Sequence, residues 1–115
     1  MVGLRDRTKQ FALRVIRLYS ALPKNTLGQV LGKQALRPGT SVAANFREAS
    51  RARSDAEFIA NLGTVEQELD ETMLSMELLV GSNIVKGQKL QPLRQEAEEL
   101  LKIVVAAIRK TRVKH

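Results

Sequence analysis

The strongest constraint on the fold is a heptad repeat of apolar residues in the segment that follows Ser54. Alternate steps of four and three residues separate its members, which are Phe58, Leu62, Val65, Leu69, Thr72, Met76 and Leu79. This spacing aligns them on one face of an α-helix, as in helices that pack into coiled coils and bundles. The segment is therefore predicted to form a long helix, with Ser54 and Glu57 as a capping box at its start and Gly81 near its C′ position.

Three other segments have apolar residues at helical spacing. The first runs from about Leu4 to Leu22, and its apolar face consists of Leu4, Phe11, Val15, Leu18 and Leu22. The second begins at Leu27 after Thr26 as N-cap, with Val30, Leu31, Ala35, Val42, Phe46 and Ala49 facing inward. The last runs from Gly87 or Lys89 to about Thr111, along Leu90, Leu93, Ala97, Leu100, Val104 and Ala107.

Pro38-Gly39 is expected to kink or interrupt the second of these helices, since proline lacks the N–H that a helix needs. Thr40 or Ser41 would then recap the continuation. Short turns between consecutive helices imply antiparallel neighbours. The sequence thus predicts an all-α protein, with residues 1–115 forming a single antiparallel, up-down-up-down, left-handed four-helix bundle.

Charged residues are segregated along the chain, whose formal net charge is +7. Residues 1–26, 27–53 and 82–115 carry net charges of +5, +4 and +5, whereas residues 54–81 carry −7 and contain no lysine or arginine. Two interpretations stay open. The acidic helix neutralises its basic neighbours within the bundle, or the uncompensated bases form an anion-binding surface.

Residues that carry catalysis or bind metals are scarce. The chain has no cysteine, and its one histidine is the last residue, His115, where fraying argues against a catalytic role. It also has no phosphate-binding glycine loop, nucleophile elbow or metal-binding histidine spacing. We predict no enzyme, cofactor or metal site, and interpret the acidic face as solvated or salt-bridged, with Glu66 and Glu68 meeting arginines of neighbouring helices or subunits.

Membrane-spanning and targeting signals are also missing from the sequence. No apolar run approaches the roughly 18 to 20 residues that a membrane span requires. The first residues, MVGLRDRTKQF, lack the apolar core of a signal peptide. A soluble cytoplasmic protein without a membrane partner is predicted.

Two basic clusters are the candidate binding residues. Arg47 and Arg51 lie four residues apart on one helix face, and Arg53 lies in the turn that follows. The C-terminal cluster consists of Arg109, Lys110, Arg112 and Lys114. Such residues bind phosphates in a salt-dependent way, although bases at a helix C-terminus also favour the helix dipole. Few aromatic residues are available for stacking, so we expect contacts with the backbone and shape of a nucleic acid.

The segment from Leu36 to Leu79, which begins LRPGTSVAANFREASRARSDAEF, resembles the central signature of a bacterial family. The family is that of the four-helix bundle proteins encoded by intervening sequences in 23S ribosomal RNA genes. The resemblance rests on a composite pattern: Gly39-Thr40-Ser41, Ala44-Asn45, Arg47-Glu48-Ala49, Arg51, Ser54, Glu57-Phe58 and the acidic cluster from Glu68 to Glu71. The spacing of the first and last helices agrees with it.

The resemblance implies a homo-oligomer and a nucleic-acid-binding role. The family is related to the accessory variability protein of diversity-generating retroelements, which assists a reverse transcriptase and binds nucleic acid. Members of this group form barrel-shaped homopentamers. We therefore expect a basic homo-oligomeric ring, a pentamer, that binds RNA or DNA, RNA above all, and a nucleic-acid-processing protein as a possible partner. The alternative is a protein-interaction scaffold in which nucleic acid has no role.

Overall fold

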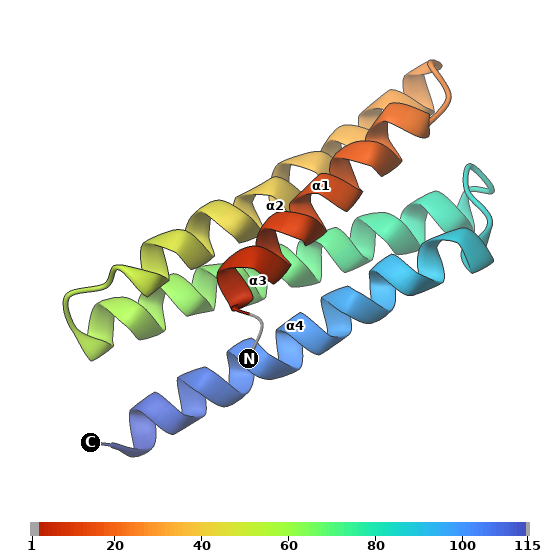
Figure 1. Cartoon of the computed structure of the whole chain (residues 1–115). Helices are drawn as coiled ribbons and strands as arrows, with labels where there is room; N and C mark the ends of the chain where they lie inside the picture. Colours follow the sequence, from red (N-terminus) through yellow and green to blue (C-terminus); the bar gives the residue numbers. More distant parts are fainter. Residues whose placement is uncertain (1–2, 115) are drawn as a thin grey trace.

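The chain folds into four α-helices that run alternately up and down (Figure 1). The computed structural model describes residues 3–114, with helices α1 (Leu4–Ala21), α2 (Thr26–Ser50), α3 (Asp55–Gly81) and α4 (Gly87–Val113). Consecutive helices pack against each other, whereas α1 and α4 share the smallest contact. The bundle measures 49 × 21 × 21 Å. The predicted all-α fold of four up-down helices is confirmed, and its left-handed twist stays a prediction.

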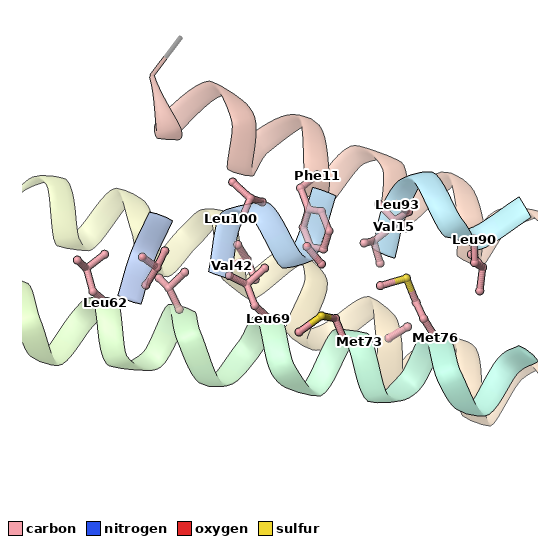
Figure 2. Close-up of a cluster of buried hydrophobic side chains, with 14 of the residues drawn as sticks. Phe11, Val15, Val42, Leu62, Leu69, Met73, Met76, Leu90, Leu93 and Leu100 are labelled. Atoms are coloured by element: carbon pink, nitrogen blue, oxygen red, sulfur yellow. The ribbon is translucent and has the colours of Figure 1, made fainter. Parts of the chain in front are cut away.

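The core consists of one apolar stripe from each helix. The heptad residues of α3 from Leu62 to Leu79 are all buried, as predicted. Figure 2 shows Leu62, Leu69 and Met76 pointing toward side chains of the other three helices. These partners include Phe11, Val15, Val42, Leu90, Leu93 and Leu100. Aliphatic side chains with regular spacing, together with Phe11, Met73 and Met76, therefore fill the centre of the bundle.

Side-chain caps start two of the helices. Asn25, rather than the predicted Thr26, caps α2, because its Oδ1 accepts a hydrogen bond from the N–H of Gly28 at 2.8 Å. Ser54 caps α3 as predicted, since its Oγ accepts from the N–H of Glu57 at 3.1 Å. The Glu57 carboxylate accepts from the N–H of Arg53 at 3.3 Å, not from that of Ser54, so the capping box is half formed.

The end of α3 corrects another prediction. The left-handed residue there is Asn83, with φ of 62°, and Gly81 is the last residue of the helix. The N–H of Ile84 donates to the carbonyl of Leu79, and that of Asn83 donates to Val80, each at 3.0 Å. This is a Schellman arrangement, in which asparagine takes the place usually held by glycine.

Helix α2 continues through Pro38 without interruption. Proline has no N–H to donate to the carbonyl of Gln34, four residues earlier. The hydroxyl of Ser75 on α3 donates to that carbonyl at 3.0 Å and so replaces the missing bond. The predicted recapping after Pro38 is wrong, since the Thr40 hydroxyl donates back to Leu36 within the helix at 2.8 Å. A kink at Pro38 stays a prediction.

The face that α2 presents to α1 is made of small residues. A Cβ added to Gly39 would lie 2.7 Å from Cγ1 of Val15, and one added to Gly32 would lie 2.7 Å from Cδ1 of Leu22. Such distances are too short for any side chain, so the two backbones are close here. The predicted inward face of α2 is confirmed for Ala35, Val42 and Ala49, which are buried, and for Leu31 and Phe46, which pack against the core. It is wrong for Val30, which is 48% exposed.

Candidate nucleic-acid interface

The up-down arrangement brings both predicted basic clusters to one end of the bundle. The C-terminal end of α2, the turn to α3 and the C-terminal end of α4 lie together there (Figure 1). We call this the basic end and define it by the seven predicted residues. They are Arg47, Arg51, Arg53, Arg109, Lys110, Arg112 and Lys114, and all are exposed.

The turn between α2 and α3 fixes where three of these arginines lie. Arg47 and Arg51 are one helical turn apart, and Arg51 is the C-cap residue of α2. The backbone N–H of Arg51 donates to the carbonyl of Glu48, and that of Arg53 donates to the Glu57 carboxylate. The backbone of the turn is thereby held while the guanidinium groups extend into solvent.

The C-terminal cluster lies against this turn. Thr111 is buried, and its hydroxyl donates to the carbonyl of Ala107 at 2.8 Å, which anchors the last turns of α4. A shallow hollow of about 360 Å³ is lined by Arg53 from the turn and Lys114 from α4. One base from each cluster, Arg53 and Lys114, thus borders the same hollow, which Asp55 also lines.

Salt bridges occur elsewhere in the bundle. Among residues 3–114 they join three arginines to glutamates, and none involves the seven residues of the basic end. Arg47, Arg51 and Arg53 are therefore not neutralised by Glu66, Glu68 or Asp70 of the acidic helix. Glu48 and Glu57 share a hollow with Arg51 and Arg53 but form no salt bridge with them.

The most regular salt bridge joins α1 to α4. Arg7 donates from Nε to Oε2 of Glu96 at 3.1 Å and from Nη2 to Oε1 at 2.7 Å, a bidentate geometry. Glu99 lies 3.7 Å from the same guanidinium group. The hydrogen bond to Glu96 raises the pKa of Arg7 above its ordinary value, against a smaller opposing effect of burial.

The α2–α3 salt bridge includes a carboxylate with a buried oxygen. Arg37 reaches Oε2 of Glu71 at 3.0 Å and Oε2 of Glu68 at 3.9 Å, so Glu68 meets an arginine of a neighbouring helix as predicted. Oε2 of Glu68 is nevertheless buried without a hydrogen bond. Burial raises the pKa of Glu68, the charge of Glu71 raises it further, and Arg37 partly opposes both.

The prediction missed two basic residues on α1. Arg5 and Lys9 line a groove of about 460 Å³ together with Arg47 and Arg51 of α2. Neither forms a salt bridge within residues 3–114. Their spacing of four residues, which places both on one face of the first helix, was the available signal. Their proximity to α2 depends on how the two helices are aligned, which the spacing does not reveal.

Aromatic side chains contribute little to this surface. Phe11 is fully buried, and Phe46 and Phe58 are partly buried and pack against the core. Tyr19 lies on the C-terminal half of α1, where its hydroxyl donates to Oε1 of Gln29 at 2.8 Å. Phe58 nevertheless lines the hollow beside Arg53 and Lys114, so the basic end has many cations and one partly buried ring.

The chain matches the family model of the 23S rRNA-intervening sequence protein over residues 4–106. The chain belongs to this family. The match includes Arg5, Lys9 and the arginines of the α2–α3 turn, whereas the C-terminal cluster lies beyond it. The family resemblance inferred from the signature between Leu36 and Leu79 is confirmed.

A crystal structure has the same fold as this member of the 23S rRNA-intervening sequence protein family. It is that of a protein of unknown function from the S23 ribosomal protein family of Bacteroides thetaiotaomicron. The two chains are 33% identical, with a TM-score of 0.86, over 92% of this chain and 98% of the other. No curated protein matches the chain.

The described part of the chain has neither a metal-binding cluster nor a membrane-spanning helix. Residues 3–114 contain no group of three potential acidic, histidine or cysteine ligands arranged to hold a metal ion. None of their helices combines the length and apolar character needed to cross a membrane. His115, the one histidine, lies outside the described residues.

Proposed function

We propose that this chain is a non-enzymatic accessory protein that binds nucleic acid through the basic end. The observation that carries the proposal is the gathering of seven exposed, unbridged bases from α2, the following turn and α4 on one end of the bundle. Unneutralised cations on a surface attract phosphates and release their counterions on binding. Membership of a family named for an element of ribosomal RNA genes supports the same direction.

The proposed ligand is structured RNA, with a DNA duplex or an RNA–DNA hybrid as related ligands. Proteins that bind single strands without sequence preference stack bases on aromatic rings. The basic end has seven arginines and lysines but one partly buried ring, that of Phe58, whose side chain also packs against the core. This composition favours contacts with the phosphate backbone and shape of a double-stranded region.

We further propose that the protein acts in the cytoplasm as a homo-oligomeric ring, a pentamer, in contact with a nucleic-acid-processing protein. Exposed apolar side chains on α2 and α3 support self-association: Val30 is 48%, Leu74 56% and Leu78 43% exposed. In a cyclic assembly each basic end is repeated, so weak phosphate contacts act together. Light scattering tests this directly, because a pentamer has five times the 12.8 kDa mass of one chain.

The test of nucleic-acid binding is fluorescence anisotropy with a labelled RNA hairpin and a matched DNA duplex across a salt series. The variant replaces Arg109, Lys110, Arg112 and Lys114 with glutamine. A matched control replaces four bases at the opposite half of the bundle, Lys24, Lys33, Lys86 and Lys89, and so removes the same charge. We expect only the first variant to bind more weakly. Its slope of log affinity against log salt concentration should fall in magnitude by about 0.9 for each phosphate contact that is lost.

A protein-interaction scaffold is the second candidate, and the exposed Leu74 and Leu78 are the observation that favours it. It predicts no RNA binding by the unaltered protein even at about 50 mM salt, the condition in which phosphate contacts are strongest. Equal weakening by the two glutamine variants would contradict a localised interface, since net charge alone would then explain the binding.

A further inference from the structure

The groove between α1 and α2 is a second cationic feature, separate from the C-terminal cluster. Four basic side chains line it, Arg5 and Lys9 from α1 and Arg47 and Arg51 from α2. Figure 1 shows these two helices side by side, with the start of α1 directed toward the end of α2. Two pairs of cations therefore line opposite sides of a groove whose volume is about 460 Å³.

The register that creates the groove follows from the glycine packing. Val15 lies over Gly39, and Tyr19 and Leu22 lie over Gly32. Because the helices are antiparallel, the residues of α1 that precede Val15 lie along the part of α2 that follows Gly39. This alignment brings Arg5 and Lys9 beside Arg47 and Arg51, where like charges repel each other.

Little within the groove compensates for this repulsion. Glu48 is the single acidic residue that lines it, and none of the four bases forms a salt bridge within residues 3–114. The other lining residues are Thr40, Ala43 and Ala44, and the Thr40 hydroxyl already donates to the Leu36 carbonyl. The small side chains among them leave room for a ligand to approach the helix backbone.

We infer that this groove binds the phosphodiester backbone of a nucleic acid strand, with Arg5 and Lys9 on one side and Arg47 and Arg51 on the other. Each pair is spaced by one helical turn, about 6 Å along the axis, the scale of the separation between neighbouring phosphates of a strand. The lining has no aromatic ring for a base and no large apolar side chain for a lipid. The inference rests on the proposed function and adds the two residues of α1 to its interface.

The test compares two double variants of α1 by anisotropy with a short RNA duplex across a salt series. The groove variant is Arg5→Gln with Lys9→Gln. The control, Arg14→Gln with Arg17→Gln, removes the same charge from the same helix outside the groove. We expect the groove variant to flatten the log–log salt dependence by about 2, one phosphate contact per residue, and the control to leave it unchanged.

A charge-preserving variant separates electrostatics from structure. Arg5→Lys with Lys9→Arg keeps both cations and is expected to retain the salt dependence of the unaltered protein. Equal salt dependences for the groove variant and the control would overturn the groove while the proposed function stands. Absence of RNA binding by the unaltered protein would overturn both. Competition by poly-glutamate as effective as that by the RNA duplex would overturn the assignment of the ligand as phosphodiester.

Discussion

On the side of α1 that faces α2, glycines bring the two backbones close, whereas on the side that faces α4 the helices touch little and an ion pair bridges them. The basic residues of α1 follow this division. Arg7 extends toward α4 and binds Glu96, with both side chains only about a quarter exposed, at 27% and 20%. Arg5 and Lys9, two residues away on either side, line the α2 groove without a carboxylate partner.

The difference shows that a basic residue of α1 forms an ion pair or stays unpaired according to which neighbouring helix it faces. Because α1 and α4 touch little, a guanidinium–carboxylate pair fits between them. Glu96 of α4 lies opposite Arg7 and accepts both of its hydrogen bonds. A close backbone approach leaves no such room, so the long side chains project from the rim of the groove. We expect substitutions on the α4 side to change stability and those at the α2 rim to change ligand binding.

The close α1–α2 approach gives the largest expected effect on stability. A Cβ at Gly39 would lie 2.7 Å from a methyl group of Val15, whose β-branched side chain has little freedom in a helix. A Cβ at Gly63 of α3 would meet nothing within 4 Å. We expect Gly39→Ala to be less stable than Gly63→Ala by about 1–3 kcal/mol, the usual effect of overpacking. Urea denaturation followed by circular dichroism measures the difference.

Comparing two alanine variants removes the general preference of helices for alanine over glycine. Gly63→Ala by itself should stabilise the protein by roughly 0.5–1 kcal/mol. A stabilisation of the same size in Gly39→Ala would show that α1 and α2 have space between them, and the structural reason for the groove would be lost.

Breaking the ion pair between Arg7 and Glu96, on the α4 side of α1, should have the next largest effect on stability. Arg7→Gln breaks a bidentate pair and leaves Glu96 largely covered without its partner. Because both side chains keep some contact with water, we expect a loss of about 1–2 kcal/mol, between the values for exposed and for buried pairs. Arg5→Gln, the matched change on the groove side, should stay within about 0.5 kcal/mol of the unaltered protein. Similar losses for both variants would contradict the division between the two sides.

The positions of the four helices were predicted well because the patterns that mark them depend only on residues that are close in the sequence. The heptad of α3 and the Ser54 cap depend on residues within a few turns of each other. The continuity of α2 through Pro38 depends instead on Ser75, which is 41 residues from Gln34. Val30 was wrongly assigned to the inward face of α2 for a similar reason, since the glycines that pack under α1 carry no apolar signal, while Val30 does.

The candidate site was predictable only in part. Exposed runs of arginine and lysine at the ends of α2 and α4 are visible in the sequence, and the up-down topology places them at the same end. Arg5 and Lys9 required the register between α1 and α2, which is set by the contact of Val15 with Gly39. Apolar periodicity therefore does not predict which residues of two neighbouring helices lie beside each other in a site.

Between α2 and α3, Arg37 pairs with a carboxylate, that of Glu68, which is poorly solvated. Burial and the charge of Glu71 raise the pKa of Glu68 above its ordinary value of 4.5, and Arg37 opposes them less strongly. Folded protein then holds a proton that the unfolded chain releases, so Glu68 contributes stability at pH values below 4.5. This contribution is lost as the pH rises through the higher pKa of the folded state.

Glu68→Gln tests this balance and gives the smallest expected effect. At pH 7 the glutamine variant should be more stable than the unaltered protein by up to about 1 kcal/mol, because it removes a buried charge without changing the shape of the side chain. The gain should disappear near pH 3, where the carboxyl group is protonated in both states. Asp70→Asn, an exposed change of the same charge on α3, should stay within about 0.5 kcal/mol at both pH values. Thermal denaturation at the two pH values measures both variants. A less stable Glu68→Gln at pH 7 would mean that the attraction of Arg37 outweighs burial, and the α2–α3 pair would then resemble the cohesive pair between Arg7 and Glu96.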